Sequence, residues 1–226
     1  MSWFSKLKQW IQFRRNDDAY ATTREKLWQG VKEATERQLL LERSIWMVAH
    51  FPDTFVLMQE QVNQWGLEYS IAKEPITTES LAGPNRDLLS PGSIHLVLAD
   101  LVPPDEAISE ASLMGNVAAM IVERHPYMPC DATLHRYFKS ISATGLRVEL
   151  GYFMAFDDPL VAAVLNETTV QVLNQLGLQS HNLINSMTLT RRLERQLQKQ
   201  QAKYVSNIDA ENVVQWLKLN SPDLSS

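Results

Sequence analysis

Apolar positions change their spacing along the chain, and each change predicts a different kind of element. Between residues 18 and 43 they recur near the 3.6-residue period of a helix with charged residues between them, which predicts one long helix. From residue 44 onward, short continuous apolar runs replace this period, as is typical of strands covered on both faces. The clearest runs are Ile45–Ala49 and the segments 67–72, 93–101, 117–123 and 146–156.

The stretches between these runs read as helices or turns. Asp53 is expected to be the N-cap of a helix that continues to about Trp65 and ends at Gly66. Residues 73–93 are rich in proline and glycine and predict a loop with at most a short helix. Helical character returns after Asp158. Strands that alternate with helices predict βαβ units, and hence an α/β fold with a mostly parallel sheet flanked by helices.

Basic and aromatic residues dominate the first 16 positions, where no acid occurs. The apolar residues stand at helical spacing and are Trp3, Phe4, Leu7, Trp10 and Ile11, and the basic residues are Lys6, Lys8, Arg14 and Arg15. This pattern predicts a helix that binds an anionic membrane surface, where each basic residue adds about 1 kcal/mol. A short amphipathic helix docked on its own domain gives the same pattern, so that alternative stays open.

Composition narrows the class of protein. A chain of 226 residues is long enough for one sizeable domain. Its single cysteine, Cys130, excludes an internal disulfide and fits a reducing compartment. The net charge of -5 argues against a dedicated nucleic-acid binder. Because no apolar run approaches the roughly 20 residues that span a bilayer, we expect a cytoplasmic protein, peripheral at the inner face of the membrane.

Nucleotide-binding and hydrolase motifs are missing from the sequence. The eight glycines are widely spaced, and none of their spacings matches a P-loop or a dinucleotide-binding fingerprint. There is no nucleophile elbow of the G-x-S-x-G type, and the five histidines are scattered. These patterns predict neither a cofactor nor a bound metal.

Chemically active residue types nevertheless gather in the stretch IVERHPYMPCDATLHRYF. One interpretation is structural: Glu123 and Arg124 tie a strand end to neighbouring loops, and Asp131 caps the helix that follows, with the cysteine packed beneath it. The alternative is a metal site, since Asp131 and His135 stand four apart on a helix and His125 is close in sequence. This alternative implies a metal-dependent hydrolase.

An acidic pair, Asp157 and Asp158, stands directly before Pro159. Proline is favoured in the first turn of a helix, so the pair is expected to cap a helix that starts there. Binding of a cation by the two carboxylates is the other interpretation of the same pattern.

The order of these features resembles a known family. From about Ser44 to about Lys203 the chain resembles the second motor domain of the SecA preprotein translocase ATPase, which lacks the phosphate loop, and the start of the scaffold helix that follows it. SIWMVAHFPDTFVLMQEQVNQWGLEYSIA resembles that domain's first strand, helix and second strand. In the family, as here, Glu-Arg-His follows a strand, and a later strand ends in an acidic pair. The resemblance implies a RecA-like sheet in which Glu123–His125 and the acidic pair are relics of the family motifs.

Two departures from the family pattern bear on catalysis. The family carries a Gly-Arg-Gly-Thr-Asp loop where this chain reads Ala99–Pro103 without glycine or arginine. It carries phosphate-binding arginines where this chain reads Phe138–Ser142, with Lys139 as the one cation. A lysine is a point charge rather than a bidentate fork, and loss of an arginine finger lowers the rate by about 10³ to 10⁵. Because the phosphate-binding first motor domain is also missing, the resemblance implies a pseudo-ATPase.

The C-terminal part predicts a helix with two faces. An apolar stripe is formed by Leu189, Leu193 and Leu197, and a basic ridge by Arg191, Arg192, Arg195, Lys199 and Lys203. The ridge is either a solvated face or a surface that binds a partner. The last segment, DAENVVQWLKLN, is another short amphipathic helix whose Trp216 packs within the chain or against a partner.

Together these observations predict four regions: an amphipathic helix (1–16), a helical extension (17–43), a RecA-like α/β domain (44–180) and C-terminal helices (181–226). They favour a catalytically inactive, membrane-peripheral adaptor or regulator with a protein partner, for which the translocase is the candidate. An enzyme remains the alternative, either a nucleotide hydrolase completed by a partner subunit or the metal-dependent hydrolase.

Overall fold

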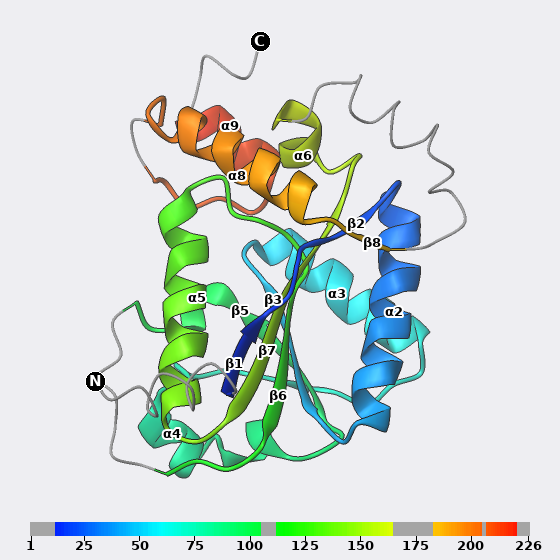
Figure 1. The fold of residues 1–226 in the computed structure, drawn as a ribbon, viewed down its shortest axis with the longest axis vertical. Coiled ribbons are helices and arrows are strands. Elements are labelled where there is room, and N and C mark those ends of the chain that lie inside the picture. Colours follow the sequence, from blue (N-terminus) through cyan, green and yellow to red (C-terminus); the bar gives the residue numbers. More distant parts are fainter. Residues whose placement is uncertain (1–11, 105–111, 165–182, 205–206, 221–226) are drawn as a thin grey trace.

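A mostly parallel sheet forms the centre of the molecule. The computed structural model describes residues 12–104, 112–164, 183–204 and 207–220. In these residues the strands are β1 (Phe13–Arg15), β2 (Ala19–Ala21), β3 (Ser44–Ala49), β4 (Ser70–Ile71), β5 (Ile94–Leu98), β6 (Asn116–Ile121), β7 (Arg147–Ala155) and β8 (Ile184–Asn185). Their order is β4-β5-β3-β6-β7-β2-β8, and β1 also pairs with β7 (Figure 1). Each of these pairings is parallel except that of β2 with β8.

Helices cover both faces of this sheet, which confirms the predicted α/β class and is consistent with a RecA-like fold (Figure 1). The described helices are α2 (Arg24–Leu40), α3 (Pro52–Gln64), α4 (Thr78–Ala82), α5 (Met128–Ala143), α6 (Pro159–Val164), α8 (Met187–Gln201) and α9 (Val213–Asn220). Two short 3-10 turns, η1 (Arg86–Leu89) and η2 (Ala99–Leu101), flank β5. In Figure 1, α8 and α9 lie across the carboxyl end of the sheet.

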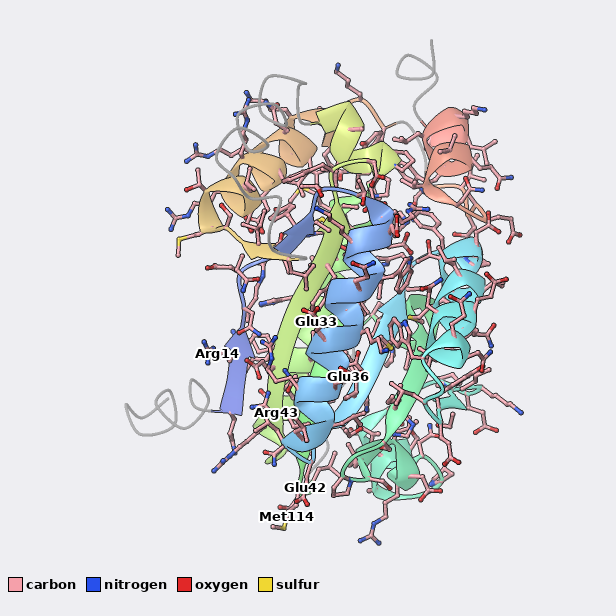
Figure 2. All side chains as sticks on the ribbon, turned by 90° about the vertical axis from the view of Figure 1, so that its right-hand side faces the viewer. Arg14, Glu33, Glu36, Glu42, Arg43 and Met114 are labelled. Carbon is pink, nitrogen blue, oxygen red and sulfur yellow. The ribbon has the colours of Figure 1, made fainter. Side chains whose placement is uncertain are left out.

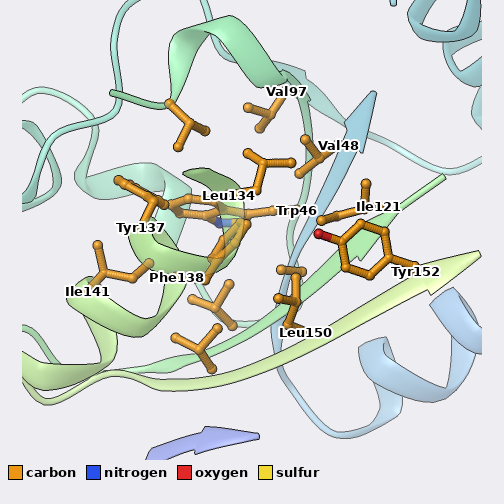
Figure 3. Close-up of a cluster of buried hydrophobic side chains, with 14 of the residues drawn as sticks. Trp46, Val48, Val97, Ile121, Leu134, Tyr137, Phe138, Ile141, Leu150 and Tyr152 are labelled. Atoms are coloured by element: carbon orange, nitrogen blue, oxygen red, sulfur yellow. The ribbon is translucent and has the colours of Figure 1, made fainter. Parts of the chain in front are cut away.

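Alternate residues of each strand pack on opposite faces, because successive side chains of a strand point in opposite directions. Trp46 and Val48 of β3 belong to the core beneath α5, where the Trp46 ring lies 5.8 Å from that of Phe138 (Figure 3). Ile45 and Met47 of the same strand belong to a second core with residues of α2 and α3. Both faces are therefore apolar, which explains the continuous apolar runs in the sequence.

The N-terminal region differs from the prediction of a long helix over residues 18–43. Residues Ala19–Ala21 are buried in β2, and the helix starts only at Arg24, after Thr23 accepts a hydrogen bond from the Lys26 amide as its N-cap. β7 has nine residues, so its free edge accommodates β1 beside its first half and β2 beside its second half. Helical periodicity cannot reveal such pairing, because the partner strand lies more than 100 residues away.

The same pairing changes the predicted helix at residues 1–16. Arg14 and Arg15 lie in the strand β1, so at these positions the helix prediction is wrong. The other predicted membrane-binding residues, Trp3 to Ile11, lie outside the described residues. Since β1, β2 and β8 all join the sheet, the α/β unit also extends beyond the predicted limits of 44–180 on both sides.

Candidate functional site

The order of the strands creates a crevice at the end of β3. The chain places β5 and β4 on one side of β3, and β6 and β7 on its other side. In open α/β sheets, ligands bind at such a switch point, outside the carboxyl ends of the strands. His50 and Phe51 follow β3, and Glu123–His125 follow β6. The cluster singled out in the sequence therefore lies where a ligand would be expected.

The carboxylate of Glu123 lies in this crevice at the place where a bound anion would be expected. Its Oε1 accepts hydrogen bonds from the backbone N–H groups of His50 (2.9 Å) and Phe51 (3.0 Å), and its Oε2 accepts one from Oγ1 of Thr54 (2.8 Å). These donors lie at the start of α3, and a helix N-terminus is the usual binding site for a phosphate or another anion. Burial raises the pKa of Glu123, opposed by the charge of His50 and by these hydrogen bonds.

Arg124 connects three elements from a buried position. Its Nη2 donates to Asp18 between β1 and β2 (2.6 Å) and contacts Glu194 of α8 (3.4 Å), while its Nη1 donates to Asp131 of α5 (3.1 Å). The guanidinium also lies 4.0 Å from the centre of the Tyr152 ring. Burial alone would lower the pKa of Arg124, but the charges of Asp131 and Asp18 raise it. The predicted tie between this strand end and its surroundings is confirmed.

Asp131 does not cap α5 as predicted. The helix starts at Met128 after the N-cap Tyr127, and Asp131 points inward from its first turn. Its Oδ1 accepts hydrogen bonds from Nε2 of His50 (2.8 Å) and from the amide of His125 (3.2 Å). Burial opposes ionisation of Asp131, but these hydrogen bonds and the charge of Arg124 lower its pKa overall. The neighbouring Cys130 is partly buried, and burial raises its pKa to about 11.

Aromatic rings fill the rest of the crevice. The Phe51 ring stacks on that of His125 at 5.1 Å, and Trp216 of α9 contacts His125 edge-on at 5.3 Å. Tyr204 also contacts Trp216 edge-on, with ring centroids 4.9 Å apart. Burial, and then the charge of His50, lowers the pKa of His125 to about 3, so its ring is neutral at pH 7. Trp216, for which the sequence left two alternatives, packs within the chain and is 1% exposed.

The metal alternative gains no support from the geometry. His135 contacts the ring of Phe13 of β1 edge-on, with centroids 5.1 Å apart. Within residues 12–104, 112–164, 183–204 and 207–220, no group of three or more His, Cys, Asp or Glu side chains is placed to hold a metal ion.

The acidic pair fastens α2 instead of capping α6 with its side chains. Asp157 Oδ2 accepts a hydrogen bond from the backbone N–H of Arg24 (3.1 Å), the first residue of α2. Asp158 Oδ1 accepts from Nη2 (2.6 Å) and Nε (3.1 Å) of the same arginine, and its Oδ2 accepts from the amide of Ala155 (2.8 Å). At α6, the backbone carbonyl of Asp158 accepts a hydrogen bond from the amide of Ala162. The predicted helix does start at Pro159, but the carboxylates of the pair bind Arg24 at the start of α2 and the Ala155 amide.

α9 and the segment before it close the crevice from outside. The carbonyl of Glu211 accepts a hydrogen bond from the Asp53 amide (3.0 Å), and Asn212 donates to the Asp53 carboxylate (2.7 Å). Asp53 was predicted to be the N-cap of α3, but the N-cap is Phe51, and Asp53 lies in the first turn of the helix. A cavity of about 510 Å³ remains beside them, and its charged lining residues are Arg24, Asp53, Glu123 and Lys218.

The predicted basic ridge lies on α8, away from the crevice. Leu189, Leu193 and Leu197 are buried against the domain, which confirms the apolar stripe. The opposite side of the helix is exposed along its length and carries Arg191, Arg192, Arg195 and Lys199, with Lys203 just beyond the helix end. The ridge is thus available to solvent, and its role as a binding surface stays a prediction.

Several residues of the site were missed in the sequence. Asp18 fell in a segment predicted to be helical, and Glu194 was passed over between the leucines and arginines of α8. His50 carried the one available signal, because it directly follows an apolar run that was correctly predicted as a strand.

The comparisons of the sequence with protein families and with curated proteins give no family for this chain. No protein-family model matches the sequence, and no curated protein matches it. Among the described helices, none combines the length and apolar character that crossing a bilayer requires.

Proposed function

We propose that this chain is a catalytically inactive, SecA motor-like domain that acts as a membrane-peripheral adaptor or regulator, linked to protein export. The proposal that the domain is catalytically inactive rests on one observation, which is the carboxylate of Glu123 at the start of α3. A phosphate placed there would meet a buried negative charge instead of free N–H groups, and unscreened like charges repel strongly in a medium of low dielectric constant.

The aromatic filling supports the same conclusion. A nucleotide base or sugar would have to displace Trp216, which is 1% exposed and contacts both His125 and Tyr204. Burial of a large apolar side chain stabilises a protein by about 1.5–3 kcal/mol, so its displacement would weaken binding by a similar amount. The chain's own residues therefore occupy the ends of β3 and β6, and the cavity of about 510 Å³ that remains beside them is lined by the carboxylates of Asp53 and Glu123.

The two departures from the family pattern have structural counterparts. Residues Ala99–Leu101 form the turn η2 where the family carries its glycine-rich loop. Phe138 and Ile141 are fully buried in the core beneath α5, so this stretch of α5 faces the sheet rather than a nucleotide. Lys139 is exposed on the outer side of the helix.

Attachment to an anionic membrane is the second half of the proposal, and it rests on the sequence of residues 3–11. Of the two arginines next to this segment, only Arg15 departs from the expectation of membrane binding. Arg15 donates to Glu194 of α8 at 2.7 Å and so belongs to the fold, while Arg14 remains exposed on β1.

The inactive part is tested by titrating the purified chain with ATP and Mg²⁺ in a calorimeter and by measuring phosphate release. We expect neither binding heat nor hydrolysis, both for the wild type and for the matched variant Glu123→Gln, in which the anion position is neutral. Saturable ATP binding by the wild type, with hydrolysis abolished by Glu123→Gln, would replace the proposal by the partner-completed hydrolase.

The adaptor part is tested by cross-linking in native membranes and capture of the tagged chain. Enrichment of translocase channel or motor subunits over a tagged control protein is the expected result. Enrichment of an unrelated membrane complex would refute the link to export and leave the adaptor role.

A further inference from the structure

Three arginines gather at the opposite end of the molecule from the crevice, on the α2 side of the sheet. Arg147 begins β7, Arg14 of β1 pairs with Glu149 of β7, and Arg43 directly precedes β3. Since Val148 of β7 packs in the core beneath α5, its neighbours Arg147 and Glu149 face the α2 side. The three arginines line one cavity of about 340 Å³. Figure 2 shows Arg14 and Arg43 on the side of the molecule that faces the viewer.

The positive charge of this cavity is not balanced by its lining. Glu149 is its only acidic lining residue, and both of its oxygens are engaged: Oε1 accepts from Asn16 (3.0 Å) and Oε2 from Arg43. The guanidinium groups of Arg14 and Arg147 are exposed and form no ion pair or hydrogen bond with any residue that the structure describes. Burial lowers the pKa of Arg43, and the nearby charge of Arg14 lowers it further, as expected for cations held close together.

Large apolar side chains stand exposed at the same end of the molecule. Leu40 and Leu41 end α2 with 85% and 54% of their surface exposed, and Leu41 also lines the cavity. Met114, shortly before β6, is 87% exposed and lies at the lower end of the view in Figure 2. Glu42, an exposed acid with a positive φ of 51°, turns the chain from α2 toward Arg43. Apolar side chains beside unpaired cations form the kind of surface that binds a bilayer interface.

We propose that this end of the domain binds the headgroup region of an anionic phospholipid membrane. One lipid phosphate lies between Arg14, Arg43 and Arg147, and the side chains of Leu40, Leu41 and Met114 enter the boundary between headgroups and acyl chains. A guanidinium matches the oxygens of a phosphate with two parallel hydrogen bonds, which is why arginine suits this ligand. The inference rests on the proposed membrane-peripheral function and gives that function a place on the folded domain.

The start of the described chain supports a membrane rather than a soluble phosphate as the ligand. Gln12 lines the cavity, so the basic and aromatic segment 3–11 precedes it directly in the sequence. A soluble phosphate would use the arginines alone and would leave Leu40 and Met114 without a role. The bilayer interface accounts for the cations and the apolar residues together.

The test is flotation of the full chain with vesicles of phosphatidylcholine, pure or mixed with phosphatidylserine, over a range of salt concentrations. The double variant Arg14→Gln/Arg147→Gln removes two exposed cations and should weaken binding to the mixed vesicles about 25-fold, since each basic residue contributes about a factor of five. Leu40→Ser/Met114→Ser should weaken binding without altering its salt dependence. The matched control is Arg136→Gln/Lys139→Gln, which makes the same charge change on the exposed side of α5 and should leave binding unchanged.

The possible outcomes distinguish a failure of this binding site from a failure of the proposed membrane attachment. If the wild type ignored the mixed vesicles, membrane attachment itself would fail, and this site with it. If the wild type bound and the Arg14/Arg147 variant bound equally well, attachment would stand and this site alone would be wrong. If the variant lost affinity for inorganic phosphate but kept its affinity for vesicles, the cavity would be a site for a soluble phosphate, and the membrane assignment would be overturned.

Discussion

The rings of Phe51 and His125 lie nearly parallel, 17° apart in orientation, with their centroids separated by 5.1 Å. Phe51 comes from the end of β3 and His125 from the end of β6, so this stack closes the switch point of the sheet. A position that binds ligands in other α/β proteins is here part of the hydrophobic core.

This stack makes stability depend on pH. The pKa of His125 falls to about 3 in the folded chain, whereas an unfolded histidine titrates near 6.5. The unfolded state therefore binds more protons below pH 6.5, and stability falls as the pH decreases from 6.5 toward 3. His125→Phe keeps the ring packing but loses the hydrogen bond from the Tyr127 amide to Nδ1, at a cost of about 1 kcal/mol at pH 7.

Urea unfolding at pH 7 and pH 5 checks this prediction. The variant should be less stable than the wild type at pH 7 and should lose less stability between pH 7 and pH 5. A residual decrease is expected in both proteins, because burial also lowers the pKa of His95 to about 4. Equal pH dependence in the two proteins would contradict the assignment of a neutral, buried His125.

Glu123→Gln should increase stability at neutral pH. Burial raises the folded-state pKa of Glu123, so the folded protein binds more protons than the unfolded chain above the unfolded value near 4.3, and stability is lost as the pH rises through the folded pKa. A glutamine oxygen still accepts from the amides of His50 and Phe51, and its NH₂ group can donate to Thr54. In thermal unfolding from pH 4 to pH 8, the gain in melting temperature of the variant over the wild type should grow as the pH rises. Glu123→Ala is the control, since it leaves the two amides without an acceptor and should destabilise at every pH.

Arg124 should be essential for folding stability because it pairs with two buried carboxylates at once, those of Asp18 (2.6 Å) and Asp131 (3.1 Å). Removal of one partner from a buried ion pair costs about 3–5 kcal/mol, and we expect this loss for Arg124→Met. Arg124→Lys should recover only part of it, since an ammonium cannot contact both acids through a planar fork. Arg15→Gln is the matched control: Arg15 also pairs with Glu194 and, at 3.6 Å, with Asp18, but its side chain is 33% exposed, and such a pair contributes about 1 kcal/mol or less. Denaturant unfolding of the three variants measures the difference, and equal losses for Arg124→Met and Arg15→Gln would refute it.

The sequence predicted β3, β5, β6 and β7 because burial on both faces leaves a recognisable apolar run in each strand. It also predicted a strand over residues 67–72, of which the sheet contains only the exposed residues Ser70–Ile71 of β4. It failed at β1 and β2, since Ala19–Ala21 form a strand only through pairing with β7. It found Glu123, Arg124 and His125 but not their partners: Asp18 and His50 reach them through the fold, from more than 70 residues away. The roles of Asp131 and Asp157 were misjudged for the same reason. Both stand near a helix start in the sequence, yet their carboxylates accept hydrogen bonds from other segments.

Trp216 should anchor the C-terminal segment over the crevice. Its ring is 1% exposed, contacts His125 and Tyr204, and donates from Nε1 to Asn207 at 3.0 Å. Trp216→Ala should therefore cost about 3–5 kcal/mol in the free energy of unfolding. Trp216→Phe keeps most of the packing and should lose less, chiefly the hydrogen bond to Asn207.

Val214→Ala on the same helix provides the control, because Val214 is 41% exposed and its truncation should change stability by less than about 0.5 kcal/mol. Hydrogen exchange of the His50 and Phe51 amides reports on the crevice itself. If Trp216 covers it as the contacts indicate, both amides should exchange faster in Trp216→Ala even under conditions where the domain remains folded. Unchanged exchange at these amides would mean that Glu123 alone protects them and that α9 covers the crevice without stabilising it.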